Sequence, residues 1–121
     1  MDFELNASPD GDVLVVAFGG RLSESNATEM VERYFDQIRA RRPKKVLADV
    51  RGLEGELSAG RVYFLVRDLP QPVPQGIKTA FLDRAERADQ AHFLESTAHN
   101  AGVELKAFAD RDVALAWLRA P

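Results

Sequence analysis

The segment KVLADVRGLEGELSAGRVYFLVR, residues 45–67, decides the fold of this chain. It begins with Val46–Val50, a short apolar run that is typical of a buried strand. A loop punctuated by glycines follows, and a helix is predicted over Ser58–Leu69. A helix on the surface of a core needs one apolar face, but this helix is apolar on both sides. We therefore expect its outer side to contact a partner, a second copy of the chain or an apolar ligand.

Strands and helices alternate on both sides of this segment. The turn residues of Ser8-Pro9-Asp10-Gly11 join the first two strands into a hairpin. Apolar periodicity predicts further strands at Phe3–Asn6, Val13–Phe18, Ile77–Leu82 and Val103–Phe108. It predicts further helices at Asn26–Arg41 and after Asp110, and another that the polar segment Asp83–Asp89 opens and that runs to about Asn100. The order β-β-α-β-α-β-α-β-α predicts an α/β sandwich whose sheet is mostly parallel, with an antiparallel hairpin at its N-terminal edge.

Capping residues and apolar stripes refine these helices. Asn26 and Glu29 have the spacing of a capping box. Gly102 stands where a C-cap glycine is expected, and Asp110 is placed to cap the last helix. The predicted core faces are Ala27, Met30, Val31, Tyr34 and Ile38, with Phe35 at the edge, then Val62, Leu65, Val66 and Leu69, then Ala91, Leu94, Ala98 and Ala101, and finally Val113, Trp117 and Leu118. Pro70, Pro72 and Pro74 predict an extended connector.

Bulk composition narrows the class of protein. The chain has 121 residues, which predicts one domain, residues 1–121. It has no cysteine, so disulfides and thiolate chemistry are excluded. Its formal net charge of −3 gives no general affinity for nucleic acid. The N-terminus does not read as a signal peptide and no apolar run is long enough to span a membrane, so we expect a cytoplasmic protein of bacterial type without stable membrane insertion.

Three segments carry a resemblance to a known family. They are KKVLADVRGLEG at the third strand, FLESTAHNAG in the third helix, and VELKAFADRDVALAWL at the C-terminus. With the order of elements, they resemble the STAS superfamily, and more narrowly its SpoIIAA-like group of small stand-alone proteins. The resemblance covers nearly the whole chain and implies a STAS-like fold. It also implies a non-enzymatic regulatory module that binds another protein, such as a kinase or a protein of the anti-sigma type.

The same resemblance implies a role for Ser58. In anti-sigma factor antagonists, the loop after the third strand reads Asp-Ser-Ser-Gly, and its first serine accepts a phosphate. Counting from Asp49, this chain has Leu57-Ser58-Ala59-Gly60 at that spacing, so Ser58 matches while Leu57 and Ala59 depart from the pattern. From the residues alone, Ser58 is a helix cap, with or without an added role as phosphoacceptor.

Two working surfaces are compatible with these patterns. In the first, Phe64 projects away from the sheet and forms an exposed patch with Leu57, Ser58 and Arg61, which predicts an interface and a homodimer. In the second, an apolar small molecule or lipid lies between the sheet and the helices. The aromatic residues of the first two helices motivate this alternative, and the resemblance of the SpoIIAA-like group to the lipid-binding CRAL-TRIO fold adds to it. The lining residues would be Tyr34, Phe35, Tyr63 and Phe64.

Catalytic and metal-binding patterns are missing from the sequence. His92 and His99 are two helical turns apart, too far for one zinc ion, and Glu95 does not complete a known motif. No nucleophile elbow or phosphate-binding loop is present. The basic residues Arg39, Arg41, Arg42, Lys44 and Lys45 have no interleaved aromatics for nucleic-acid binding. We expect no enzymatic activity, cofactor, metal or nucleic-acid partner.

Overall fold

The computed structural model describes residues 3–55, 57–69 and 75–121 and contains five strands and four α-helices. The predicted connector of Pro70, Pro72 and Pro74 lies outside these residues. The strands are β1 (Phe3–Asp10), β2 (Val13–Arg21), β3 (Lys45–Glu54), β4 (Lys78–Leu82) and β5 (Leu105–Phe108). The helices are α1 (Ala27–Arg41), α2 (Ala59–Arg67), α3 (Ala88–Asn100), preceded by a 3-10 turn at Ala85–Arg87, and α4 (Arg111–Arg119).

The strands form one sheet in the order β1-β2-β3-β4-β5. β1 and β2 pair antiparallel, and the remaining neighbours pair parallel, as the sequence predicts. β1 and β3 are longer than predicted because pairing with β2 continues past their apolar runs, to Asp10 in β1 and Glu54 in β3. The predicted α/β fold with an antiparallel N-terminal edge is therefore confirmed.

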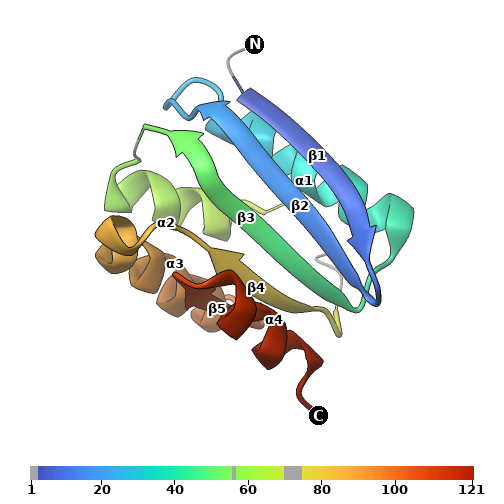
Figure 1. Cartoon of the computed structure of the whole chain (residues 1–121). Coiled ribbons are helices and arrows are strands. Elements are labelled where there is room, and N and C mark those ends of the chain that lie inside the picture. Colours follow the sequence, from blue (N-terminus) through green and yellow to red (C-terminus); the bar gives the residue numbers. More distant parts are fainter. Residues whose placement is uncertain (1–2, 56, 70–74) are drawn as a thin grey trace.

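Helices cover both faces of the sheet (Figure 1). α1, α2 and α3 lie on one face, and α4 lies on the other, against β3, β4 and β5. Side chains alternate between these layers along each strand. Val46 and Ala48 belong to the core on the α1 side, whereas Leu47 between them belongs to the core under α4.

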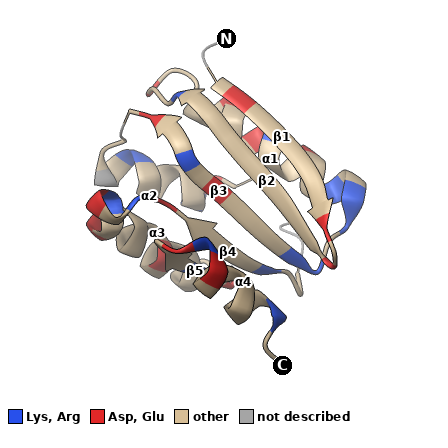
Figure 2. Ribbon diagram, viewed as in Figure 1, with Lys and Arg blue, Asp and Glu red and all other residues tan. Residues whose placement is uncertain are grey.

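The face of β3 beyond α4 is polar. Asp49 and Arg51 follow Leu47 at alternate positions, so they share its face of the sheet. The Arg51 guanidinium donates to both carboxylate oxygens of Asp49, at 3.0 and 2.9 Å. Figure 2 shows acidic and basic residues along β3. On this face of the sheet, charged side chains therefore occupy the part that no helix covers, and apolar side chains occupy the part under α4.

Two helix ends differ from the sequence prediction. The prediction of a capping box at Asn26 and Glu29 is wrong, because the Asn26 side chain does not cap α1. It accepts the N–H of Ser23 (2.9 Å) and donates to the carbonyl of Arg21 (2.8 Å), which closes the turn after β2. Ala101 is exposed because it follows the end of α3 as its C-cap.

The buried face of α4 is also rotated relative to the prediction. Val113 is 54% exposed, whereas Ala114, Leu115 and Leu118 are buried. Trp117 lies at the edge of this stripe, with its ring 5.5 Å from that of Phe108. Asp110 caps α4 as predicted, because its side chain accepts the N–H groups of two residues in the first turn.

Candidate functional site

β4 shows how the two faces of the sheet are used. Ala80 and Leu82 are fully buried under α4. Thr79, Phe81 and Asp83 point to the opposite face, where they line a cavity. Thr79 and Asp83 are roughly 13 Å apart along the strand, at about 3.3 Å per residue. These two polar residues therefore mark two ends of the cavity, with Phe81 between them.

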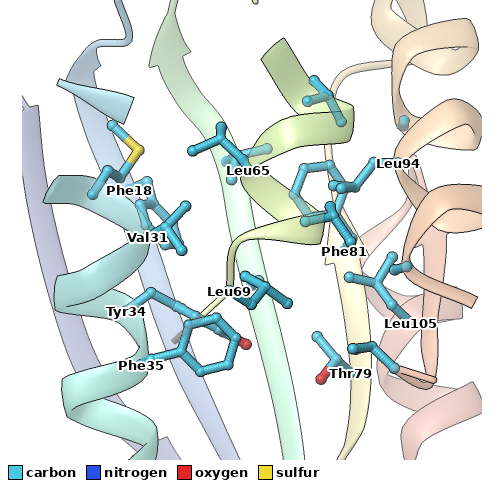
Figure 3. Close-up of a pocket in the computed structure, with 18 of the residues that line it drawn as sticks. Phe18, Val31, Tyr34, Phe35, Leu65, Leu69, Thr79, Phe81, Leu94 and Leu105 are labelled. Atoms are coloured by element: carbon cyan, nitrogen blue, oxygen red, sulfur yellow. The ribbon is translucent and has the colours of Figure 1, made fainter. Parts of the chain in front are cut away.

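The cavity lies between the sheet and helices α1, α2 and α3, and its volume is about 370 Å³. Its walls are mainly apolar. In Figure 3, Val31, Tyr34 and Phe35 enter it from α1, Leu65 from α2, and Leu94 from α3, while Phe81 and Leu105 enter it from the sheet. Apolar walls of this kind favour an apolar occupant over water.

α2 is the wall of the cavity opposite the sheet. It packs sideways against α1 and α3. Val62 and Val66 are buried on its inner side and Leu65 is half-buried there, as is Leu69 just past the end of the helix. All four line the cavity. The inner face of α2 is therefore apolar because it faces the cavity as well as its neighbouring helices.

The outer face of α2 is aromatic. Tyr63 is 48% exposed and Phe64 is 45% exposed, with ring centroids 5.4 Å apart in an edge-to-face arrangement. The Arg67 guanidinium lies 4.6 Å from the centroid of the Phe64 ring. Tyr63 and Phe64 do not line the cavity, as the ligand alternative would require, and Phe64 is exposed, as the interface alternative predicts. Tyr34 and Phe35 do line the cavity.

Tyr34 and Thr79 form a polar pair inside the cavity. Both residues line the cavity. Burial raises the pKa of Tyr34 to about 12, although the neighbouring Thr79 hydroxyl acts in the opposite direction. The phenol is therefore neutral at physiological pH, and both hydroxyls can donate and accept hydrogen bonds.

Asp83 and Arg87 form an ion pair that also faces the cavity. The Arg87 guanidinium lies 2.8 Å from the Asp83 carboxylate, and their side chains are only 11% and 7% exposed. Arg87 also donates to the carbonyls of Val50 (3.2 Å) and Leu53 (2.9 Å) at the end of β3. Its buried Nε has no hydrogen-bond partner among the described residues. Burial raises the pKa of Asp83, against the lowering effect of the Arg84 N–H and the Arg87 charge.

Among the described residues, the exposed part of the cavity lining lies near the amino ends of β4 and β5. Gln75, Gly76, Gly102 and Glu104 line it there, and all four residues are exposed. Thr79 lies on β4 close to these residues, and its backbone N–H donates to the Glu104 carbonyl at 3.1 Å. The Tyr34–Thr79 pair is therefore nearer to this exposed end than the Asp83–Arg87 pair, which lies at the other end of β4.

The loop between β3 and α2 is held by the backbone. Gly55 has φ +91°, and a Cβ on it would lie 2.4 Å from the Leu22 carbonyl oxygen, so glycine is required there. Gln90 of α3 donates to the Leu57 carbonyl at 2.9 Å. Leu57 is half-buried and lines the cavity, so it does not extend the exposed patch around Phe64.

Ser58 and Arg61 lie at the start of α2. Ser58 is the N-cap, and its Oγ accepts the N–H of Arg61 at 3.1 Å, as the sequence predicts for a cap. The Arg61 guanidinium bonds Thr28 Oγ1 (2.7 Å) and pairs with Glu24 (3.4 Å). Ser58 is exposed, whereas Arg61 ties α2 to the start of α1.

The residues set aside as metal or nucleic-acid ligands are dispersed. His92 and His99 are exposed on α3, and Glu95 accepts the N–H of Ala107 at 3.0 Å. No group of three metal-ligating side chains occurs in the described ranges. Lys45 pairs with Asp12 at 2.9 Å. Within the same ranges, no helix is long and apolar enough to cross a membrane.

Sequence reasoning missed the polar residues of the cavity. Thr79, Asp83, Arg87 and Gln90 were not singled out. One signal was present: Thr79 and Asp83 interrupt the apolar pattern of KTAFLD at alternate positions, on the side of the strand that carries Phe81. Arg87 and Gln90 gave no comparable signal, because charged and amide residues at a helix start are usually solvated.

Comparison with known proteins places the fold. No protein-family model matches the chain, and no curated protein matches it. Among solved structures, an anti-sigma factor antagonist from Mycobacterium paratuberculosis matches with a TM-score of 0.67 and 15% identity, over 98% of this chain and 95% of that one. An uncharacterized protein of the DUF3478 family from Shewanella loihica PV-4, described as having a SpoIIAA-like fold, matches with a TM-score of 0.61 and 20% identity, over 97% and 94% of the two chains. The chain therefore has a SpoIIAA-like fold, as the resemblance of its sequence predicts.

Proposed function

We propose that this protein binds a small apolar molecule in the cavity between its sheet and helices α1, α2 and α3. One observation carries the proposal: a space of about 370 Å³ with mainly apolar walls. Ligand pockets in proteins typically have volumes of roughly 300–1,000 Å³ and apolar walls with a few polar groups. The cavity has this size, and Tyr34, Thr79, Asp83 and Arg87 are among its polar groups.

The energetics of an empty cavity support the same proposal. Water could fill the space, but water in a cavity needs two to four polar partners, and the walls offer few. An apolar ligand that displaces such water gains affinity. Occupancy should therefore stabilise the fold.

Native mass spectrometry of protein purified gently from its own host tests this function. We expect a non-covalent adduct that is released into organic extracts. Leu65→Trp, which fills the cavity from α2, should abolish the adduct. Phe64→Trp places the same side chain on the exposed outer face of α2 and should keep it. A folded protein that carries no adduct, and whose unfolding temperature does not rise with any extract fraction, would contradict the proposal.

A second function, docking of a protein at the outer face of α2, is supported by different observations. Tyr63 and Phe64 are exposed beside each other, and Arg67 adds a cation to the patch. Ser58, the candidate phosphoacceptor, is exposed at the start of the same helix. The fold is similar to that of an anti-sigma factor antagonist. On this reading, the partner is a second copy of the chain or a regulatory protein, such as a kinase or a protein of the anti-sigma type. A phosphate on Ser58 would change docking by its charge and bulk.

Analytical ultracentrifugation and mass spectrometry test the second function. Phe64→Asp should shift a dimer to monomer without unfolding the domain. Phe93→Asp is the matched control, because Phe93 is 39% exposed on another helix. A subunit mass raised by one phosphate, and lost in Ser58→Ala, would establish the modification. An unchanged mass distribution in Phe64→Asp would contradict the homodimer, and an unmodified Ser58 in cells would contradict the phosphate switch.

A further inference from the structure

We propose that the ligand is an uncharged molecule with a long apolar body and a hydroxyl or carbonyl group, which hydrogen-bonds at Tyr34 and Thr79. This inference rests on the proposed function of the cavity and adds the chemical class of its ligand. It follows from the charges that face the cavity, from the position of its exposed end, and from the hydrogen-bonding capacity of one pair of hydroxyls.

The charges inside the cavity cancel each other. Among the described residues, the charged side chains that line it are Asp83, Arg87 and Glu104. Arg87 is paired with Asp83 at 2.8 Å and also bonds carbonyls of β3, so the pair presents no net charge to a ligand. A ligand carboxylate at Arg87 would have to compete with Asp83, and a ligand cation at Asp83 would have to displace Arg87. Burial of an uncompensated ion is costly, so this end disfavours a charged group.

The exposed end of the cavity also disfavours an anion. Glu104 is exposed there and is the one charged side chain from the described residues that lines this end. A ligand carboxylate at the exposed end would face this like charge, and no lining cation from the described residues would offset it. The polar group of the ligand is therefore better matched by neutral hydrogen-bonding partners than by an ionic one.

Tyr34 and Thr79 supply those neutral partners. Each hydroxyl has one O–H donor and two acceptor lone pairs, and both residues line the cavity. The pair therefore retains a donor for a ligand carbonyl and acceptors for a ligand hydroxyl. Because Tyr34 stays neutral at physiological pH, its O–H remains available as a donor. Figure 3 shows both side chains at the same end of the cavity.

The dimensions set the size of the apolar body. At about 30 Å³ for each water-sized group, the cavity holds roughly a dozen such groups. From Thr79 to Asp83 the wall extends roughly 13 Å along β4, with Phe81 between the two polar residues. A ligand whose polar group lies at Thr79 would thus extend its apolar part past Phe81 toward the neutral ion pair.

Competition binding with twelve-carbon probes tests the ligand class. The fluorescent reporter is N-phenyl-1-naphthylamine, an uncharged apolar dye, and the competitors at pH 8 are 1-dodecanol, dodecanoate and dodecyltrimethylammonium below their aggregation thresholds. We expect dodecanol to displace the dye at a concentration at least about tenfold lower than either ion. Equal or tighter binding of dodecanoate or of the ammonium compound would overturn the inference while leaving the cavity as a ligand site.

Variants locate the polar contact. Tyr34→Phe removes one hydroxyl, and we expect it to lower the affinity for dodecanol relative to that for the dye by about tenfold. Tyr63→Phe is the matched control, because Tyr63 lies outside the cavity, and it should leave the ratio unchanged. An unchanged ratio in Tyr34→Phe would overturn the assignment of the contact. Failure of the dye and of all three competitors to bind the folded protein would instead overturn the proposed function itself.

Discussion

The Asp83 carboxylate and the Arg87 guanidinium lie 2.8 Å apart in an almost fully buried ion pair, but the two side chains depend on it unequally. Arg87 also donates to the carbonyls of Val50 and Leu53, where β3 passes beyond the end of β4. Asp83 accepts from the Arg84 N–H at 2.8 Å, and an amide oxygen could replace it in that bond. Arg87 therefore joins α3 to β3, while Asp83 mainly balances its charge.

This asymmetry predicts different stabilities for two variants. Arg87→Met leaves a buried carboxylate without its cation and two carbonyls without a donor, so it should lower the free energy of unfolding by about 3–5 kcal/mol. Asp83→Asn keeps the bond to Arg84, and because burial raises the pKa of Asp83, its neutral form suits the site. It leaves the Arg87 cation without its counter-ion but keeps the other hydrogen bonds of both side chains, so we expect a smaller loss than for Arg87→Met, about 1–3 kcal/mol. Urea unfolding followed by circular dichroism measures both; equal losses would contradict the asymmetry.

Asp49 predicts a dependence of stability on pH. Burial acts to raise its pKa, but the hydrogen bonds from Arg51 outweigh this, and the pKa is lowered from 3.8. The folded state therefore holds the carboxylate ionised more strongly than the unfolded state does. The resulting stability is present above the unfolded pKa and is lost as the pH falls through the folded pKa. Relative to Asp49→Asn, the parent should lose about 1 kcal/mol between pH 6 and pH 2.

Asp83 serves as the internal control for that experiment because its sign is opposite. Its pKa is raised in the folded state, so its protonated form stabilises the fold, and that contribution is lost as the pH rises through the folded pKa. Relative to Asp83→Asn, the parent should therefore lose stability as the pH increases. Urea titrations of the parent and the two variants at several pH values distinguish the two carboxylates; slopes of the same sign would show that one assignment is wrong.

Ser58 predicts a measurable capping effect that is separate from any phosphate. Its Oγ accepts the Arg61 N–H at the start of α2, so Ser58→Ala should lower the free energy of unfolding by about 1 kcal/mol. Ser58→Asn supplies another acceptor at the same position and should restore most of the loss. If Ser58→Ala were as stable as the parent in thermal unfolding, the cap would contribute nothing to α2.

The parts of the fold that the sequence predicted are those with strong local signals. Val13–Phe18 and Val46–Val50 are apolar runs that pairing only extends, and Asp110 and Gly102 are caps with known chemistry. Asn26 was misread because its side chain bonds Ser23 and Arg21, two contacts that depend on the path of the chain after β2. Local spacing cannot reveal such contacts.

The sequence predicted where the cavity lies, but only some of the residues that line it. Tyr34 and Phe35 were placed there because α1 has a clear apolar stripe, and both line the cavity. The periodicity of α2 also predicted that Phe64 projects away from the sheet, and Phe64 is exposed. The alternative that Tyr63 and Phe64 line the ligand site does not match the lining of this cavity. The Arg87 pair was missed because its burial depends on where β3 ends, which is a tertiary property.

Two variants of α4 test which of its residues face the sheet. The sequence pattern placed Val113 and Leu118 together on the buried face, but Val113 is 54% exposed while Leu118 is fully buried against the sheet. Leu118→Ala should therefore lower the free energy of unfolding by about 2–5 kcal/mol, since it leaves a cavity in a packed core. Val113→Ala should change it by less than about 0.5 kcal/mol, because the removed methyl groups are largely solvated. If urea unfolding showed comparable losses in the two variants, Val113 would belong to the core, and the orientation of α4 on the sheet described here would be wrong.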